Sequence, residues 1–330
     1  MQRIGLARAR VMNRRTFLCG LTLGTLVATA QATKIPRIGW LSGPARFGLS
    51  EFKQRLGELG YIVGQSVLMD IRSPKSDEFS AYPDLAAQLI ATGVDVVLAA
   101  NPLSLAAVSA ATKTIPIIGV DLESDPVNKG WAASLAHPGR NVTGFFLDIP
   151  EMSGKQLQFL KEVKPNLSQV AILGDSQVNQ LQFEATEITA RNSGLTLHPL
   201  AVKSPAEIAS AIAGAARKGA RALVALTSPL VNIGLKRVAE AAVAQRLPSI
   251  CGFVPIFAQA GGLLAYGPDF PDLFHRAAGY VAMILKGSKP DELPIQRPTK
   301  FNLVINLKTA KALGLTIPQS LLVRAEEIIQ

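Results

Sequence analysis

The sequence predicts an α/β protein of two lobes, each built on a doubly wound parallel sheet and joined to the other by a hinge. Short apolar runs alternate with amphipathic helical segments from residue 35 onwards, a pattern typical of parallel sheets covered by helices. The alternation occurs twice, separated by Pro- and Gly-rich segments near 138–144 and 266–271, where we expect the chain to cross between lobes. At 330 residues the chain is long enough for two medium-sized domains.

The first half of the predicted elements follows an export leader. Strands are expected at 35–41, 66–71, 94–100 and 115–120, with a further strand starting at 141–144, and helices at 50–59, 83–92 and 103–112. The helix at 83–92 begins with a proline and is followed by Gly93, as helices commonly are. The strand at 94–100 is almost continuously apolar, which indicates a strand covered on both faces.

The second half repeats this rhythm. Helices are expected at 153–163, 180–192, 204–218, 230–245, 253–259 and 273–286, and strands at 170–173, 195–202, 222–226, 248–252 and 263–267. Ser204 and Glu207 have the spacing of a capping box, with Pro205 at the first helical position. A Pro-rich linker at 291–298 leads to a strand at 301–305 and a closing helix from 308.

Residues 1–32 predict export through the twin-arginine pathway. Arg14 and Arg15, followed by Phe17, form a twin-arginine motif, and a short apolar stretch at 19–32 contains two small-residue cleavage sites, 28–30 and 30–32. The apolar stretch is too short to span a bilayer, so we expect a soluble, periplasmic product. Met12 is an alternative start. Cleavage would leave Cys251 as the one cysteine and exclude an internal disulfide.

The positive charge of the chain lies largely in this leader. The formal net charge is +10, and residues 1–32 contain five arginines and no acid, which leaves +5 on the rest. That remainder has no long basic run and no nucleic-acid-binding signature. We therefore expect no nucleic-acid partner.

Motifs for catalysis, metal binding or cofactor binding are missing from the sequence. It contains no nucleophile elbow, zinc-protease motif, phosphate loop or dinucleotide fingerprint, and its three histidines are scattered. Cys251 is expected to be a small buried residue. Asp121, Glu123 and Asp125 alternate like cation ligands but lack the calcium-loop spacing, so turn and capping roles are favoured, with Asp125 a candidate to face a cleft.

Polar or small residues recur directly after the predicted strands. Because the carboxyl ends of parallel strands meet at one edge of a sheet, these residues are expected to surround a small ligand held between the two lobes. The candidate ligand-binding residues are Ser42, Asn101, Asp125, Asp175, Ser228, Phe253 and Tyr266. For any one of them, an ordinary role in a turn is an equally good interpretation.

The chain after the leader resembles the ABC-transporter substrate-binding proteins related to tryptophan and tyrosine uptake. The most specific parts of the resemblance are PTKFNLVINLKTAKALGLTIP at 298–318 and Asp125-Pro126-Val127. The resemblance implies a type I periplasmic binding-protein fold, capture of a small organic ligand, delivery to an ABC permease in the inner membrane, no cofactor and no catalysis. We expect a first lobe of 33–143 plus about 268–300 and a second of 144–267 plus about 301–330, although the sequence leaves open which lobe holds 301–330.

One departure from the family bears on the ligand. Members suited to amino acids often carry acids after the glycine equivalent to Gly252, whereas Phe253 and Val254 follow it here. An apolar or aromatic ligand is therefore expected, with Phe253 and Tyr266 as stacking faces. Two alternative functions remain open at this point: a ligand-binding sensory module for a membrane receptor, and an exported Rossmann-like enzyme.

Overall fold

The computed structural model describes residues 34–330 apart from 76–77, 122–123 and 177. The leader, with Arg14, Arg15 and Phe17, lies outside the described residues, as does Glu123. Among the helices that are described, none has the length and apolar character needed to cross a bilayer.

The first sheet consists of parallel strands in the order β2-β1-β3-β4-β5. The strands are β1 (Arg37–Leu41), β2 (Leu68–Arg72), β3 (Val96–Ala99), β4 (Ile117–Asp121) and β5 (Val142–Phe146). Every pairing in this sheet is parallel. Their carboxyl ends therefore lie at one edge, as the strand–helix alternation predicts.

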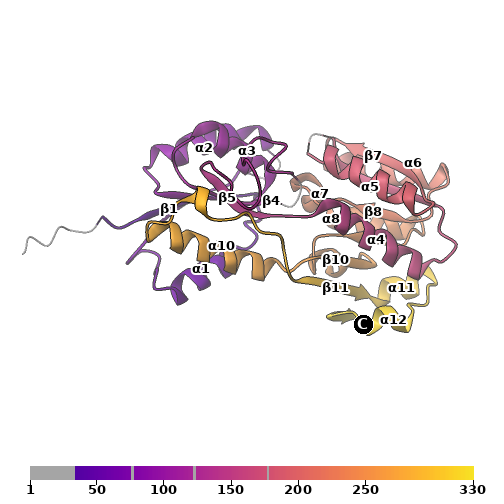
Figure 1. Cartoon of the computed structure of the whole chain (residues 1–330). Helices are drawn as coiled ribbons and strands as arrows, with labels where there is room; N and C mark the ends of the chain where they lie inside the picture. The colour runs from indigo at the N-terminus through magenta and orange to yellow at the C-terminus, as the bar shows by residue number, and fades with distance from the viewer. Residues whose placement is uncertain (1–33, 76–77, 122–123, 177) are drawn as a thin grey trace, which may run out of the picture. The chain divides into compact units, whose positions relative to one another are not determined.

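Helices cover both faces of this sheet, as Figure 1 shows. On one face lie α1 (Leu49–Glu58) and α10 (Phe270–Leu285), whose apolar side chains pack with Trp40 of β1. On the other lie α2 (Tyr82–Ala91), preceded by η1 (Phe79–Ala81), and α3 (Pro102–Ala111), which pack against Leu41 of the same strand. Alternate residues of one strand thus enter two separate cores.

The second sheet has the order β12-β11-β10-β9-β8-β6-β7. Its strands are β6 (Gln169–Asp175), β7 (Thr196–Val202), β8 (Leu223–Ala225), β9 (Ser249–Cys251), β10 (Leu264–Pro268), β11 (Phe301–Asn306) and β12 (Glu327–Ile329). The sheet is parallel except where β11 runs antiparallel to β10. Residues 301–306 and 327–329, whose lobe the sequence left open, thus belong to this sheet.

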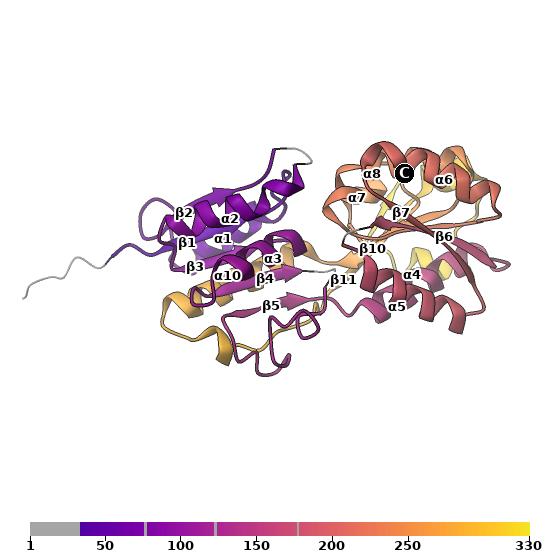
Figure 2. The ribbon, with the colours of Figure 1, turned by 90° about the horizontal axis from the view of Figure 1, so that it is seen from above.

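The second sheet is also covered on both faces, as Figure 2 shows from above. One core contains residues of α4 (Ile149–Val163), α5 (Gln180–Asn192), α11 (Leu307–Leu313) and α12 (Gln319–Leu322). The other contains residues of α6 (Ile208–Arg217), α7 (Pro229–Ile233), α8 (Leu235–Ala244) and α9 (Ile256–Gln259). Two 3₁₀ turns, η2 (Pro205–Glu207) and η3 (Pro290–Glu292), complete the described elements.

The chain passes between the two sheets three times, after β5, after β10 and before β11. Because β5 pairs with β4 as far as Phe146, the first crossing comes later than the segment 138–144 expected from the sequence. The first two crossings lead into helices whose first turns are capped by Asp148 and Asp269. These caps start α4 and α10 earlier than the predicted positions 153 and 273. We propose the limits of the lobes at these crossings.

Candidate functional site

A cavity of about 110 Å³ lies where the carboxyl ends of both sheets meet. From the first lobe it is lined by residues 42–45, Phe47, Ala100, Asn101 and Val120, together with Phe270 and Phe274 of α10; from the second by Thr227, Pro229, Asn232, Ile233 and Phe253. Ser42, Asn101, Thr227 and Phe253 follow β1, β3, β8 and β9. The site therefore occupies the position at which open α/β sheets bind ligands.

Phenylalanine side chains form much of the cavity wall and connect the lobes. The ring of Phe253 lies edge-on to Phe47, with 4.6 Å between ring centroids, and edge-on to Phe270 at 5.0 Å. Phe274 continues the wall and packs on Trp40 at 5.6 Å. Phe253 is 4% exposed, whereas Phe47 is 38% exposed. The wall is thus aromatic and draws residues from both lobes.

Asn101 holds the α3 side of the cavity in place. Its Oδ1 accepts from the Ser104 backbone N–H at 2.8 Å, and its Nδ2 donates to the Tyr82 hydroxyl at 3.0 Å. Burial of Tyr82 raises the pKa of its hydroxyl to about 12, against a smaller lowering by this hydrogen bond. Both ends of the Asn101 amide are therefore used within the protein.

Asn232 of α7 differs from Asn101 in this respect. Its backbone N–H donates to the Ser228 carbonyl at 2.8 Å, but its side-chain Oδ1 is buried and has no hydrogen-bond partner among the described residues. Ser42 Oγ, in contrast, donates to the Gly43 carbonyl at 3.2 Å. The cavity thus contains one buried side-chain acceptor that the described protein groups leave unused.

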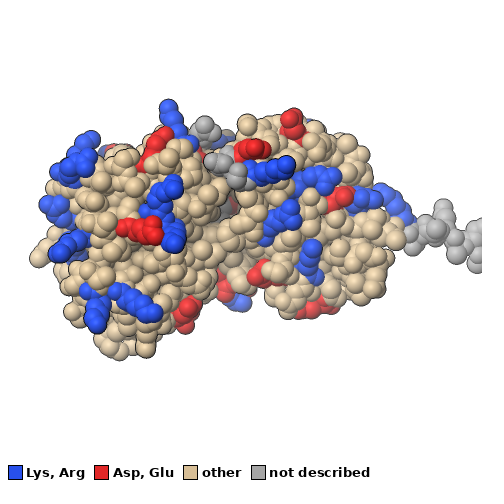
Figure 3. Space-filling model, turned by 180° about the vertical axis from the view of Figure 1, so that it is seen from behind, with Lys and Arg blue, Asp and Glu red and all other residues tan. Residues whose placement is uncertain are grey.

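The cavity is uncharged as far as its described lining is concerned. None of those lining residues has an ionisable side chain. Over the face seen in Figure 3, Lys and Arg lie scattered among Asp and Glu and form no continuous basic stripe. Charged side chains thus lie on this outer face, and none lies among the described residues that line the cavity.

The seven sequence-predicted site residues divide into two groups. Ser42, Asn101 and Phe253 line the cavity. Ser228 lies between two lining residues, Thr227 and Pro229, and its side chain caps α7 by accepting from the Val231 N–H at 3.2 Å.

The other three predicted residues have contacts elsewhere. Asp125 Oδ1 accepts from the backbone N–H groups of Val127 and Asn128 at 2.8 and 3.1 Å, and its Oδ2 from Asn128 Nδ2 at 3.2 Å, so the carboxylate closes its own turn. Asp175 is 4% exposed, and Asn179 Oδ1 accepts from its backbone N–H at 2.6 Å. The Tyr266 ring packs edge-on to Phe159 at 4.8 Å and is stacked on Phe301 at 5.8 Å.

Sequence reasoning missed several lining residues because they do not directly follow strands. Phe47 precedes α1, Asn232 lies in α7, and Phe270 and Phe274 lie on α10, which returns to the first sheet after β10. The two phenylalanines directly after the second crossing were a local signal for Phe270 and Phe274, and no comparable signal marks Phe47 or Asn232.

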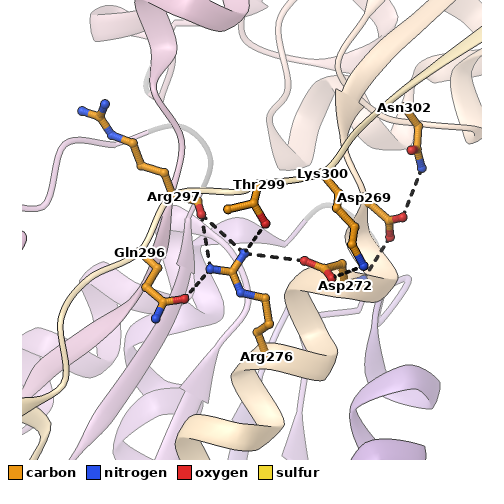
Figure 4. A network of polar contacts seen from close by, with 8 residues as sticks. All are labelled: Asp269, Asp272, Arg276, Gln296, Arg297, Thr299, Lys300 and Asn302. Carbon is orange, nitrogen blue, oxygen red and sulfur yellow. Dashed lines mark hydrogen bonds and ion pairs between the residues drawn. The ribbon is translucent and has the colours of Figure 1, made fainter. Parts of the chain in front are cut away.

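A polar network joins the crossings, as Figure 4 shows. Arg276 of α10 donates to Thr299 Oγ1 at 3.3 Å and to the Arg297 carbonyl at 3.4 Å, both in the third crossing. Asp269, at the second crossing, accepts from Asn302 Nδ2 at 3.3 Å. Arg297 also forms an ion pair with Asp148 at the first crossing. The network thus contacts all three connections between the sheets.

The described residues offer little for covalent or metal chemistry. Burial raises the pKa of the Cys251 thiol to about 12, so the thiolate is scarce at neutral pH. Within the described part of the chain, no group of three His, Cys, Asp or Glu side chains is placed to hold a metal ion.

Comparison with known proteins finds relatives that match most of the chain. The sequence profile of the ABC transporter substrate binding protein family matches residues 34–329. A tyrosine-binding protein of Clostridioides difficile (strain R20291) is 26% identical over 271 residues, covering 80% of this chain and 75% of the relative.

Two solved structures are similar along most of their length. The structure of an ABC domain in complex with L-Trp from Streptococcus pneumonia has a TM-score of 0.82 and 28% identity, and the match covers 89% of this chain and 99% of that one. A conserved domain protein from Vibrio cholerae has the same TM-score with 25% identity, and the match covers 89% and 100% of the two chains.

Proposed function

The chain belongs to the ABC transporter substrate-binding protein family, whose members capture a solute for a transporter, and we propose that the solute of this chain is aromatic and binds in the cavity between the lobes. The relatives that bind tyrosine and L-Trp support an aromatic ligand. The match to a substrate-binding family supports binding without catalysis and delivery to a permease.

The observation that carries this proposal is the contact between Phe47 and Phe253 across the cavity. The two rings come from opposite lobes, and their centroids lie 4.6 Å apart. A flat ligand beside these two rings gains contact with both lobes at once, and separating the lobes would break that contact. Binding and closure would therefore favour each other, which is how a hinged receptor holds its solute.

Three of the sequence-predicted residues are proposed as ligand contacts. Phe253 would supply an aromatic face, and Ser42 and Asn101 would border the ligand on the first-lobe side. The structural contacts of Asp125, Asp175, Ser228 and Tyr266 support roles in shaping the fold around the site.

Export by the twin-arginine pathway and a periplasmic location are also part of the proposal. Arg14, Arg15 and Phe17 supply the motif. Solute capture requires access to solutes outside the inner membrane, which an exported receptor has. On the face seen in Figure 3 the charges are of mixed sign, which agrees with the expectation of no nucleic-acid partner.

A thermal-shift screen tests aromatic capture. The protein lacking residues 1–32 would be heated with L-Trp, L-Tyr, p-cresol, indole and 4-hydroxybenzoate, using L-Ala as the non-aromatic control. An aromatic ligand at a hundred times its Kd should stabilise the protein by about 2.7 kcal/mol. If none of the aromatic molecules raises the melting temperature, aromatic capture is wrong.

A pair of phenylalanine variants locates the binding site. Phe253→Leu should weaken binding of the best aromatic molecule by up to about tenfold, because an edge-on aromatic contact is lost. Phe301→Leu, outside the cavity and stacked on Tyr266, should leave affinity unchanged. Equal losses in the two variants would place the site elsewhere.

A further inference from the structure

We propose that the cavity selects a neutral, single-ring aromatic molecule with a hydrogen-bond donor on the ring, of the phenol type, and discriminates against amino acids. This inference rests on the proposed function and names its substrate class. Four independent features of the cavity support it: its size, its lack of charge, the position of Phe253 and the free acceptor on Asn232.

The size of the cavity suits one aromatic ring. Its volume of about 110 Å³ is smaller than the roughly 150 Å³ of an engineered apolar cavity that binds benzene, so it leaves room for one ring at most. The Phe47 and Phe253 rings meet across the site, so further room would require the lobes to separate. A ring with small substituents therefore fits better than a ring that carries a full amino-acid backbone.

The charge of the lining disfavours an amino-acid head group. A zwitterion brings an ammonium and a carboxylate, and burying either without an opposite charge or several hydrogen bonds is unfavourable. The described lining residues include no ionisable side chain. A neutral ligand has no such requirement.

Phe253 occupies a key position after β9. The two residues that follow Gly252 are Phe253 and Val254, which are 4% and 6% exposed. The Phe253 ring is fixed between Phe47 and Phe270, at 4.6 and 5.0 Å. Apolar side chains thus surround the point where the chain leaves β9 and borders the cavity. An ammonium group there would lose its hydration and gain no hydrogen bonds or opposite charge in exchange.

Asn232 adds a polar requirement. Its Oδ1 is buried with no partner among the described residues, although the residue lines the cavity. Asn101, the other lining amide, uses its Oδ1 and Nδ2 for Ser104 and Tyr82. Because this oxygen is inaccessible to water, the Asn232 side chain has to turn Oδ1 into the cavity before a ligand O–H can donate to it. A ligand O–H would then satisfy the buried acceptor, and a hydrocarbon of the same shape would not. Asn232 is therefore a specificity-determining residue.

Isothermal titration calorimetry with matched ligands tests the inference. The protein lacking residues 1–32 would be titrated with p-cresol, toluene, 4-hydroxybenzoate, L-Tyr and L-Trp. We expect p-cresol to bind about tenfold tighter than toluene, because only p-cresol donates a hydrogen bond. We expect at least about a hundredfold preference for p-cresol over L-Tyr, since only L-Tyr buries a charged head group.

Asparagine variants assign the preference to one side chain. In Asn232→Ala, p-cresol and toluene should bind equally, within about twofold, because the acceptor is gone. Asn192→Ala, at the exposed end of α5, should keep the wild-type preference. Circular dichroism and the melting temperature would establish that both variants are folded.

The outcomes separate this inference from aromatic capture itself. If L-Tyr or L-Trp binds as tightly as p-cresol, or 4-hydroxybenzoate binds tighter, the neutral ligand class is wrong while aromatic capture stands. If Asn232→Ala keeps the preference for p-cresol over toluene, the assigned role of Asn232 is wrong. If no aromatic molecule binds, both proposals fall together.

Discussion

Lys300 and Asp272 form an ion pair in which Lys300 Nζ lies 2.8 Å from Asp272 Oδ1. Lys300 belongs to the third crossing between the sheets, and Asp272 to the first turn of α10, directly after the second crossing. The hydrogen bond that the Lys300 ammonium donates to the Asp272 carboxylate raises the pKa of Lys300. Asp272 also pairs with Arg276 of the same helix at 3.5 Å, so one carboxylate joins the first turn of α10 to the third crossing.

Asp272→Asn should loosen these crossings. It removes the charge that holds Lys300 and Arg276 together, and we expect a melting temperature lower by about 2 °C and a smaller effect in high salt. Differential scanning calorimetry measures both. Glu240→Gln is the matched control, because Glu240 pairs with Lys236 on an exposed helix face at 3.9 Å and should change nothing. An equal shift in the two variants would contradict a special role for the crossing.

Gly267→Ala should destabilise the second lobe strongly. A Cβ at this position would lie 1.9 Å from the backbone carbonyl oxygen of Gly252, which cannot move without disturbing β9 and β10. We expect a loss of about 3 kcal/mol in the free energy of unfolding, measured in urea. Gly279→Ala, inside α10 with open space around its Cβ, should instead add about 0.5–1 kcal/mol. Similar effects of the two changes would refute this packing argument.

Tyr82 should make the protein less stable in alkali. Its pKa is about 12 in the folded protein, against an ordinary value of 10.0. Between these values the unfolded chain loses the proton while the folded protein keeps it, so the contribution is present below about pH 10 and is lost as the pH rises through about 12. Urea unfolding at pH 9 and 11 should show a larger fall for the wild type than for Tyr82→Phe. The same fall in Tyr82→Phe would exclude Tyr82 as the source.

Asp125→Ala should affect stability but not binding. Both carboxylate oxygens are engaged with Val127 and Asn128 in the turn, so their loss should lower the free energy of unfolding by about 1 kcal/mol. The affinity for the best aromatic ligand, measured by calorimetry, should stay within about twofold of the wild type. A tenfold or greater loss of affinity would show that Asp125 contributes to ligand binding.

The leader should depend on its two consecutive arginines. Arg14→Lys combined with Arg15→Lys should leave the precursor in the cytoplasm, because the twin-arginine pathway reads this pair. Cell fractionation and immunoblotting measure the distribution. Arg8→Lys with Arg10→Lys, which keeps the charge outside the motif, should preserve export. If the Arg14/Arg15 double variant is found in the periplasm, the assignment to the twin-arginine pathway is wrong.

Three cavity-lining residues could be located from sequence because their positions depend on local order alone. Ser42, Asn101 and Phe253 follow apolar strands, and the carboxyl ends of parallel strands meet at one edge regardless of the details of packing. Asp125 and Tyr266 follow or lie in strands as well, yet one closes its own turn and the other packs between Phe159 and Phe301. Side-chain direction after a strand depends on neighbours that are distant in sequence.

The sequence by itself determined the alternation of strands and helices, the two-lobed α/β class and the sheet edge at which the cavity lies, since periodicity and capping are local properties. The tertiary structure alone decided three further features. It ran β11 antiparallel to β10, placed Phe270 and Phe274 of α10 in the cavity wall, and left the Asn232 acceptor buried at the same cavity. Each of these depends on contacts between segments far apart in the chain, which no local pattern encodes.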